Sequence, residues 1–163
     1  MHGKEAIRNA YDMSQMVLTA YVNDLSDQEL LTRPGEGCNH IAWQLGHLIT
    51  AESGMLESIA PGFSVQLPEG FADKHSKENT ASDDPSDFLS KAEYLDYFAK
   101  LKEAAHKALD SLSDDDLAKE PPEHLKQICQ NAGGVFVLIA THPMMHVGQF
   151  VPVRRMHGKP VVI

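Results

Sequence analysis

The sequence is poor in cysteine and in uninterrupted apolar runs, and each shortage excludes a class of protein. Its two cysteines, Cys38 and Cys129, lie far apart and form no CxxC pattern, so no disulfide framework is expected. No run of about 18 residues is free of polar and charged side chains. The N-terminus MHGKEAIRNA lacks the apolar segment of a secretory signal. We therefore expect a cytoplasmic protein with no membrane segment.

Basic residues are also scarce, and this shortage excludes another set of partners. The chain has 14 Lys and Arg against 23 Asp and Glu, a formal net charge of −9. A surface of that sign repels the phosphates of nucleic acids and of anionic lipids. We expect no nucleic acid and no membrane among the partners, and a small molecule or another protein instead. At 163 residues the chain fits one domain, 1–163, with a real core.

Apolar residues at helical spacing predict four long helices, and no segment shows the alternation of a β-strand. The predicted helices cover residues 4–22, the stretch from the cap Asn39 to Pro61, a stretch that begins at the cap Ser90, and the stretch from Asn131 to Met156. Residues 61–87 are rich in Pro, Gly, Ser and Asp and have no apolar period, which indicates a long loop. The predicted fold is all-α, a four-helix bundle with a long crossover between its second and third helices.

Two segments of similar sequence, DLSDQELLTRP and SLSDDDLAKEPP, follow the first and third predicted helices. In the first, Ser26 and Glu29 have the spacing of a capping box, which predicts one short helical turn. The echo indicates two similar helical hairpins. Alternatively, Leu-Ser-Asp is simply a good sequence for restarting a helix.

The last predicted helix contains two prolines, Pro143 and Pro152. Each removes a backbone donor and crowds the carbonyl four residues earlier, at a cost of about 3 kcal/mol in a straight helix. We therefore expect a kink at Pro143 that turns His142 toward the bundle axis.

The stretch THPMMHVGQFV places His142 and His146 four residues apart, on one face of the last helix. That spacing is typical of metal ligands, and His47, in the second long helix, is the best third donor. Three neutral imidazoles with a fourth position open are typical of a reactive zinc site and also suit nickel, iron or copper. The alternative is a hydrogen-bonded core histidine at His47 and a chance pair at 142 and 146.

The remaining histidines and the other possible motifs are less informative. We expect His2, His75, His124 and His157 to be solvated, and His40 to cap a helix, lie at the surface or line the mouth of a pocket. An HExxH protease needs glutamate where Pro143 stands. A ferritin-like di-iron site needs two ExxH motifs, and only residues 103–106 have that form. Neither cysteine carries the signature of a nucleophile.

Two stretches resemble the motifs of one known family. HIAWQLGHLITAE resembles the second-helix motif of the DinB-like (YfiT-like) metalloproteins. THPMMHVGQFVPVRRMHGKP resembles their C-terminal motif, in which HxxxH is followed by a small residue, a glutamine and a basic helix end that stops at glycine. The segments LPEGFADKH and SLSDDDL are similar to one subset of the family, so the resemblance covers nearly the whole chain. Pro143 departs from the pattern, because relatives often have glutamate there.

The resemblance implies a fold, a metal site and a class of chemistry. It implies the family's four-helix bundle, frequent homodimers, and a divalent metal, zinc or nickel, held by His47, His142 and His146. Characterised relatives include bacillithiol S-transferases and the mycothiol-dependent maleylpyruvate isomerase. We therefore expect a transferase or isomerase that joins a low-molecular-weight thiol cosubstrate to a small electrophile. A stress-related metal-binding or sensor module without catalysis is the alternative, and a vestigial site is a third.

The resemblance also has a physical rationale. A divalent cation with three neutral ligands keeps its full charge, so a thiol at its open position ionises near neutral pH and becomes a nucleophile. Candidates for substrate binding are Gln149, one turn beyond His146, together with His40 and Arg154.

Overall fold

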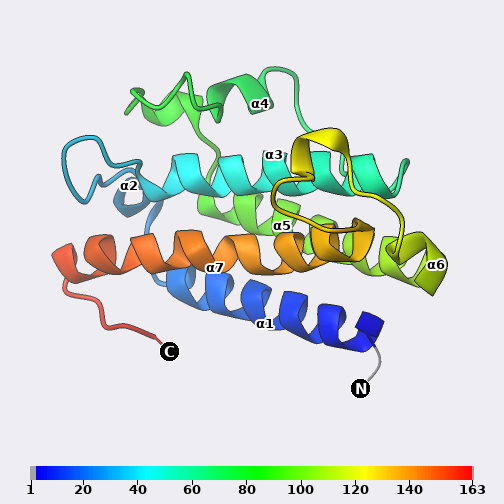
Figure 1. Ribbon diagram of the computed structural model, residues 1–163. Coiled ribbons are helices and arrows are strands. Elements are labelled where there is room, and N and C mark those ends of the chain that lie inside the picture. Colours follow the sequence, from blue (N-terminus) through cyan, green and yellow to red (C-terminus); the bar gives the residue numbers. More distant parts are fainter. Residues whose placement is uncertain (1–2, 163) are drawn as a thin grey trace.

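The computed structural model describes residues 3–162, and over that range its regular secondary structure is entirely helical, with no β-strand. The prediction of an all-α protein is therefore confirmed. The four long helices are α1 (Gly3–Asn23), α3 (Ile41–Ile59), α5 (Lys91–Ser111) and α7 (Ala132–Met156) (Figure 1). The short ones are α2 (Asp27–Leu30), α4 (Phe71–Lys74), α6 (Asp114–Leu117) and two 3₁₀ turns, η1 (Pro85–Asp87) and η2 (Glu123–Leu125).

The long helices enclose the apolar core, and each packs against two others. Helix α1 contacts α5 and α7, and α3 contacts the same two helices (Figure 1). Towards one end the core is built around residues such as Leu18, Leu45 and Phe150. Towards the other it is built around residues such as Leu56 and Phe136. Because burying each such side chain contributes about 1.5–3 kcal/mol, this packing holds α3 and α7 side by side.

Capping boxes form at the starts of three helices, α2, α5 and α6. The backbone N–H of Glu29 donates to the Ser26 hydroxyl at 3.2 Å, and the backbone N–H of Ser26 donates to the Glu29 carboxylate at 2.6 Å. The same reciprocal pair forms between Ser90 and Glu93 at the start of α5. Ser113 and Asp116 repeat it at the start of α6, so the two similar segments also fold alike.

The cap of α3 agrees with one of the roles expected for His40 and differs from the cap expected at Asn39. The capping residue is His40 and not Asn39, since the His40 Nδ1 accepts the backbone N–H of Trp43 at 3.0 Å. An imidazole nitrogen can accept this bond as a carboxylate or hydroxyl oxygen does, and the helix then begins at Ile41.

Helix α7 passes both of its prolines without interruption. It begins after Asn131, whose side chain accepts from the Gly134 N–H at 2.8 Å, and it ends before Gly158, where φ is 67°. Both limits agree with the prediction. The helix is continuous through the buried Pro143, and Figure 1 shows no sharp bend along α7, so the kink expected at Pro143 is not seen. His142 is therefore placed by a regular helix.

By length and composition, α7 is also long and apolar enough to cross a membrane, and no other helix of residues 3–162 is. The core helix of a soluble protein meets the same criteria. Phe136, Ile139 and Phe150 of α7 are buried against the other helices, and 39% of the apolar stretch of this helix is buried.

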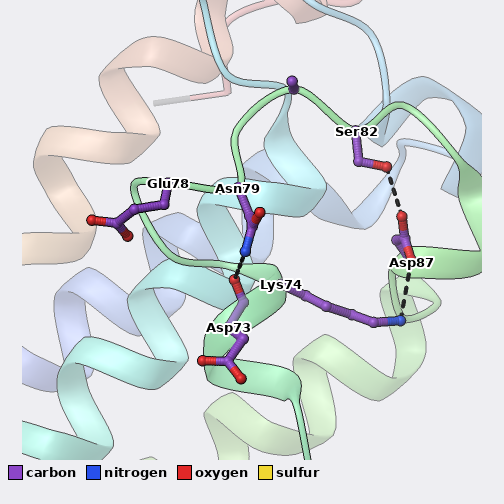
Figure 2. A pocket seen from close by; sticks show the side chains of 7 residues that line it. Asp73, Lys74, Glu78, Asn79, Ser82 and Asp87 are labelled. Carbon is purple, nitrogen blue, oxygen red and sulfur yellow. Dashed lines mark hydrogen bonds and ion pairs between the residues drawn. The ribbon is translucent and has the colours of Figure 1, made fainter.

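The segment from 61 to 87, predicted to be a plain loop, contains two helical turns and two buried anchors. It crosses above α3 (Figure 1), and Phe71 and His75 are 4% and 1% exposed. Its outer part is held by local polar contacts. The Asn79 amide donates to the Asp73 carbonyl at 2.8 Å, and Asp87 accepts from Ser82 at 2.7 Å and pairs with Lys74 at 3.2 Å (Figure 2).

The prediction that His75 is solvated is therefore wrong. His124 and His157 are exposed, as expected. His2 lies outside the described residues.

Candidate metal centre

Three histidines from two facing helices converge at one point of the fold. His47 lies on α3, and His142 and His146 lie on consecutive turns of α7. One nitrogen of each ring lies within 4.8 Å of one nitrogen of the other two. The Nε2 atoms of His142 and His146 are 3.2 Å apart. The contact between α3 and α7 brings together residues about 100 positions apart in the chain.

The geometry of the cluster suits a divalent metal. Two nitrogens bound to one tetrahedral zinc ion lie roughly 3.3 Å apart, close to the spacing between His142 and His146. Among the described residues the cluster contains no carboxylate and no thiolate. An all-imidazole set of three suits zinc, nickel or copper and leaves a further coordination position for water or substrate.

Hydrogen bonds and stacking hold the ligands in place. The Nδ1–H of His146 donates to the Gln44 side-chain carbonyl at 2.9 Å, which leaves Nε2 directed at the cluster. Gln44 is itself fixed, because its amide donates to the Asn39 carbonyl at 3.0 Å. His47 lies near the backbone of His75 and stacks on Trp43, with ring centroids 5.1 Å apart and planes 5° apart. Such outer contacts orient the ligands and strengthen metal binding.

Burial keeps the three rings neutral, which is the form that binds a metal. Loss of solvent lowers the pKa of His47 and of His142, and nearby positive charge lowers each further. For His146, burial and then the charges of the two other rings lower the pKa to about 4. At neutral pH all three imidazoles therefore offer a lone pair.

A pocket of about 480 Å³ opens beside the histidines, and two of them, His47 and His142, form part of its wall. Most of the rest of its lining is apolar and comes from α3, η2 and α7, including Ala51, Met55, Leu125, Ile128, Leu138 and Met145. Lys77, His124 and Thr50 supply the polar part. A site with this volume and lining accommodates a small, largely apolar molecule next to the ligands.

The crossover segment is fixed to α3 directly beside His47. The His75 imidazole lies against the backbone of Gly46, so closely that a Cβ on this glycine would be 2.0 Å from His75 Cδ2. The His75 Nδ1–H donates to the Phe71 carbonyl at 2.8 Å, and Nε2 accepts from the Tyr94 hydroxyl at 3.0 Å. A glycine is therefore required before His47, and His75 ties α3, α4 and α5 together.

The other predicted site residues do not join the cluster. His40 is fully buried, with both ring nitrogens engaged: one by the cap of α3 and the other by the Ser82 carbonyl at 3.1 Å. Its ring holds the start of α3 to the crossover segment, and its role in substrate binding stays a prediction. Gln149 is exposed on α7, and its amide contacts only the Met145 carbonyl at 3.5 Å. Its role in substrate binding stays a prediction.

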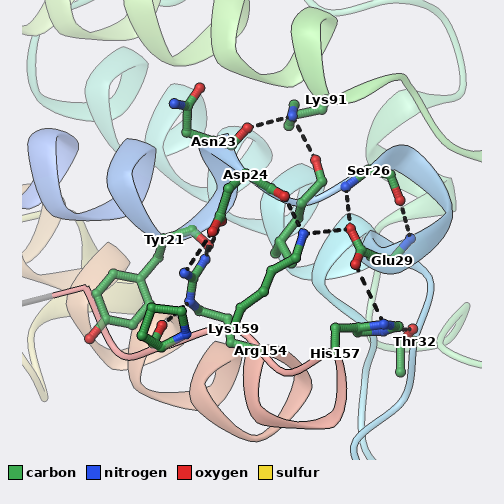
Figure 3. Close-up of polar contacts among 12 residues, drawn as sticks. Tyr21, Asn23, Asp24, Ser26, Glu29, Thr32, Lys91, Arg154, His157 and Lys159 are labelled. Atoms are coloured by element: carbon green, nitrogen blue, oxygen red, sulfur yellow. Dashed lines mark hydrogen bonds and ion pairs between the residues drawn. The ribbon is translucent and has the colours of Figure 1, made fainter.

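Arg154 is held in structural contacts as well, and these contacts do not support its predicted role in substrate binding. Its side chain is 1% exposed and pairs with both carboxylate oxygens of Asp24, at 2.5 and 3.0 Å. It also donates to the carbonyls of Tyr21 and Pro160 (Figure 3). The pairing lowers the pKa of Asp24. These contacts fasten the end of α7 to the end of α1, and the guanidinium has no face free for a ligand.

Three supporting residues escaped the sequence analysis. Gln44 and Trp43 precede His47 by three and four positions, so they lie on the same side of α3, and this spacing was the available signal. Lys77 carried no signal, because it reaches the pocket only through the fold of the crossover segment.

Comparison with known proteins agrees with the resemblance of the two histidine motifs. No protein of curated function matches the sequence significantly. A family model described as the DinB superfamily matches residues 10–150, which include all three clustered histidines. With most of its length covered by that model, and with an all-helical fold, the chain belongs to the DinB superfamily.

Proposed function

We propose that the protein is a metal-dependent enzyme. It either transfers a low-molecular-weight thiol onto a small electrophile or uses the thiol to isomerise that electrophile. One observation carries the proposal: three neutral imidazoles, and no anionic ligand, lie beside an open and largely apolar pocket. An all-neutral ligand set leaves the charge of a divalent metal undiminished, and the pocket offers room for the second reactant.

The residues of the chain have separate tasks in this proposal. His47, His142 and His146 hold the metal, zinc or nickel. Gln44 accepts the Nδ1–H of His146, so that the Nε2 of this ring faces the metal position. The apolar wall around Met55 and Leu138 binds the body of the electrophile and excludes water from part of it. When bound, the metal would lower the pKa of a coordinated thiol and so supply a thiolate at neutral pH.

Three further assignments belong to the same proposal. The four long helices and the segment that crosses from α3 to α5 support a four-helix bundle with a long crossover. The protein acts in the cytoplasm, where low-molecular-weight thiols stay reduced. It works as a homodimer, as is common in the family.

The test is metal content and turnover measured on the same samples. Wild-type protein, purified without a tag, should hold about one metal ion per chain and should accelerate conjugation of a chromogenic electrophile with at least one biological thiol. His47→Ala should lose both properties and keep its helical circular dichroism. His157→Gln, which changes an exposed histidine away from the cluster, should keep both.

Two outcomes would contradict the proposal. Turnover that persists after the metal is removed would mean that the histidines do not support the chemistry. A fully metal-loaded wild type that accelerates no thiol reaction would identify a binding or sensor module instead.

A further inference from the structure

The pocket beside the histidines has a charge character opposite to that of the whole protein. The chain contains 23 acidic residues and carries a net charge of −9, yet no carboxylate lines this pocket. Apart from the two metal ligands in its wall, its ionisable side chains are Lys77 and His124, and its remaining polar group is the Thr50 hydroxyl. A pocket with nitrogen donors and no carboxylate favours an anionic guest.

Lys77 differs from every other lysine of the chain in having no partner. Lys74, Lys100, Lys102, Lys107, Lys119, Lys126 and Lys159 pair with carboxylates, and Lys4 and Lys91 donate to backbone carbonyls. Lys77 forms neither an ion pair nor a hydrogen bond with the described residues. On a protein with an excess of acidic side chains, this ammonium is the one left available.

The fold places this free ammonium at the metal centre. Lys77 follows His75 by two residues, and the His75 ring is fixed between Gly46 and the Tyr94 hydroxyl. The backbone of His75 in turn lies near the His47 ring. Lys77 and His47 both line the same pocket. Anchored in this way, the segment holds Lys77 at the edge of an apolar cavity beside the ligands.

We propose that Lys77 is a specificity-determining residue that binds a carboxylate of the substrate while the reacting part lies at the histidines. The inference rests on the proposed function and names the substrate class of that site: small molecules with one anionic end and an apolar or thiol-bearing end. The carboxylate belongs either to the thiol or to the electrophile, and the two sources give different results below.

The first arm measures thiol binding to the zinc-loaded protein by isothermal titration calorimetry. The probes are 3-mercaptopropionate, which carries a carboxylate, and 2-mercaptoethanol, which is neutral. If the thiol supplies the carboxylate, the wild type binds the anionic thiol about fivefold better than the neutral one, the upper end for an ion pair in contact with solvent. Lys77→Gln loses that preference and binds the neutral thiol unchanged. Lys74→Gln, a matched change at a lysine paired with Asp87, keeps it.

The second arm measures kcat/KM for addition of 2-mercaptoethanol to acrylate and to acrylamide. If the electrophile supplies the carboxylate, Lys77→Gln lowers kcat/KM for acrylate severalfold and leaves kcat/KM for acrylamide unchanged. In the first arm it then leaves the relative affinities for the two thiols unchanged. The inference is overturned if Lys77→Gln leaves two ratios unchanged while both thiols still bind. These are the affinity for 3-mercaptopropionate relative to 2-mercaptoethanol, and the kcat/KM for acrylate relative to acrylamide. Zinc-loaded wild type that binds no thiol would overturn the proposed function itself, and the inference with it. Equal zinc content and circular dichroism in all variants exclude misfolding as the cause.

Discussion

At the scale of single residues, we expect metal binding by the three histidines to depend on Gln44 as well. Gln44→Met keeps the side-chain volume and removes the oxygen that accepts the Nδ1–H of His146. We expect metal affinity to fall roughly 10- to 100-fold, because an unheld imidazole is a poorer ligand. Competition with a chromogenic chelator measures the affinity.

Gln44→Glu is the matched control for that change. It keeps the acceptor for His146 and loses only the donor to the Asn39 carbonyl. Because a carboxylate is a strong acceptor for an imidazole N–H, metal affinity should stay within a few-fold of the wild type. Equal affinity in Gln44→Met and wild type would show that the bond has no role in metal binding.

A second residue-scale prediction concerns Glu52, a carboxyl group on α3 that is 2% exposed. Tyr11 donates to one of its oxygens, and the other has no hydrogen-bond partner among residues 3–162. Burial raises the pKa of Glu52 to about 8, from an ordinary value of 4.5. The folded state therefore retains a proton that the unfolded chain releases above about pH 4.5.

The sign of the effect follows from which state holds more protons. Between about pH 4.5 and 8 the folded state holds more, so the free energy of unfolding falls as the pH rises, by at most about 1.4 kcal/mol per pH unit from this group. Glu52→Gln should reduce the pH dependence of the free energy of unfolding across this window, as measured by urea unfolding at several pH values. The same slope in the variant and the wild type would rule Glu52 out as its source.

The sequence predicted the three clustered histidines better than their surroundings. His47, His142 and His146 were identifiable because helical spacing and two motifs mark them. The burial of Arg154 was not predicted, because its position in the last turn of α7 suggested exposure, whereas its partner Asp24 comes from the other end of the chain. Pairings across such a distance depend on the three-dimensional fold, which local patterns do not encode.

At the scale of elements, helix limits were predictable and the crossover segment was not. Caps such as Ser90 and stop signals such as Gly158 act within a few residues, so the sequence alone places them. The segment from 61 to 87 has no apolar period, because it is held by a few single anchors such as His75 and not by a continuous apolar face. A histidine in such a stretch therefore looked solvated although it is buried.

Two glycines of α3 test how tightly the crossover is fixed to that helix. Gly46→Ala puts a methyl group onto the His75 ring, which is held by two hydrogen bonds and cannot easily move. We expect a loss of about 1–3 kcal/mol in the free energy of unfolding. Urea unfolding of the metal-free protein measures it.

Gly54→Ala is the control within the same helix. No atom lies within 4 Å of the added methyl group, and alanine is the better helix former by about 0.8–1 kcal/mol. The two substitutions should therefore have opposite signs. A neutral Gly46→Ala would mean that the contact with His75 is loose.

At the scale of the whole molecule, the metal would act as a cross-link between α3 and α7. Because a ligand that binds only the folded state stabilises it, zinc at 100 to 1,000 times its Kd should add about 2.7–4.1 kcal/mol. For a domain of this size that corresponds to a rise in Tm of roughly 5–15 °C. Differential scanning calorimetry with and without a chelator measures the shift.

His142→Ala provides the comparison for the thermal experiment. It removes one ligand, so added zinc should leave its Tm nearly unchanged. An equal shift in the variant and the wild type would indicate that zinc binds elsewhere on the molecule.

The stacking of Trp43 on His47 has an optical consequence. Trp43 is the only tryptophan of the chain, and its indole lies parallel to the ring of a predicted metal ligand. Zinc has a filled d shell and quenches fluorescence little, whereas open-shell ions such as nickel or copper quench a nearby indole strongly. The protein therefore carries an intrinsic fluorophore whose emission distinguishes which metal occupies the centre, without any added dye.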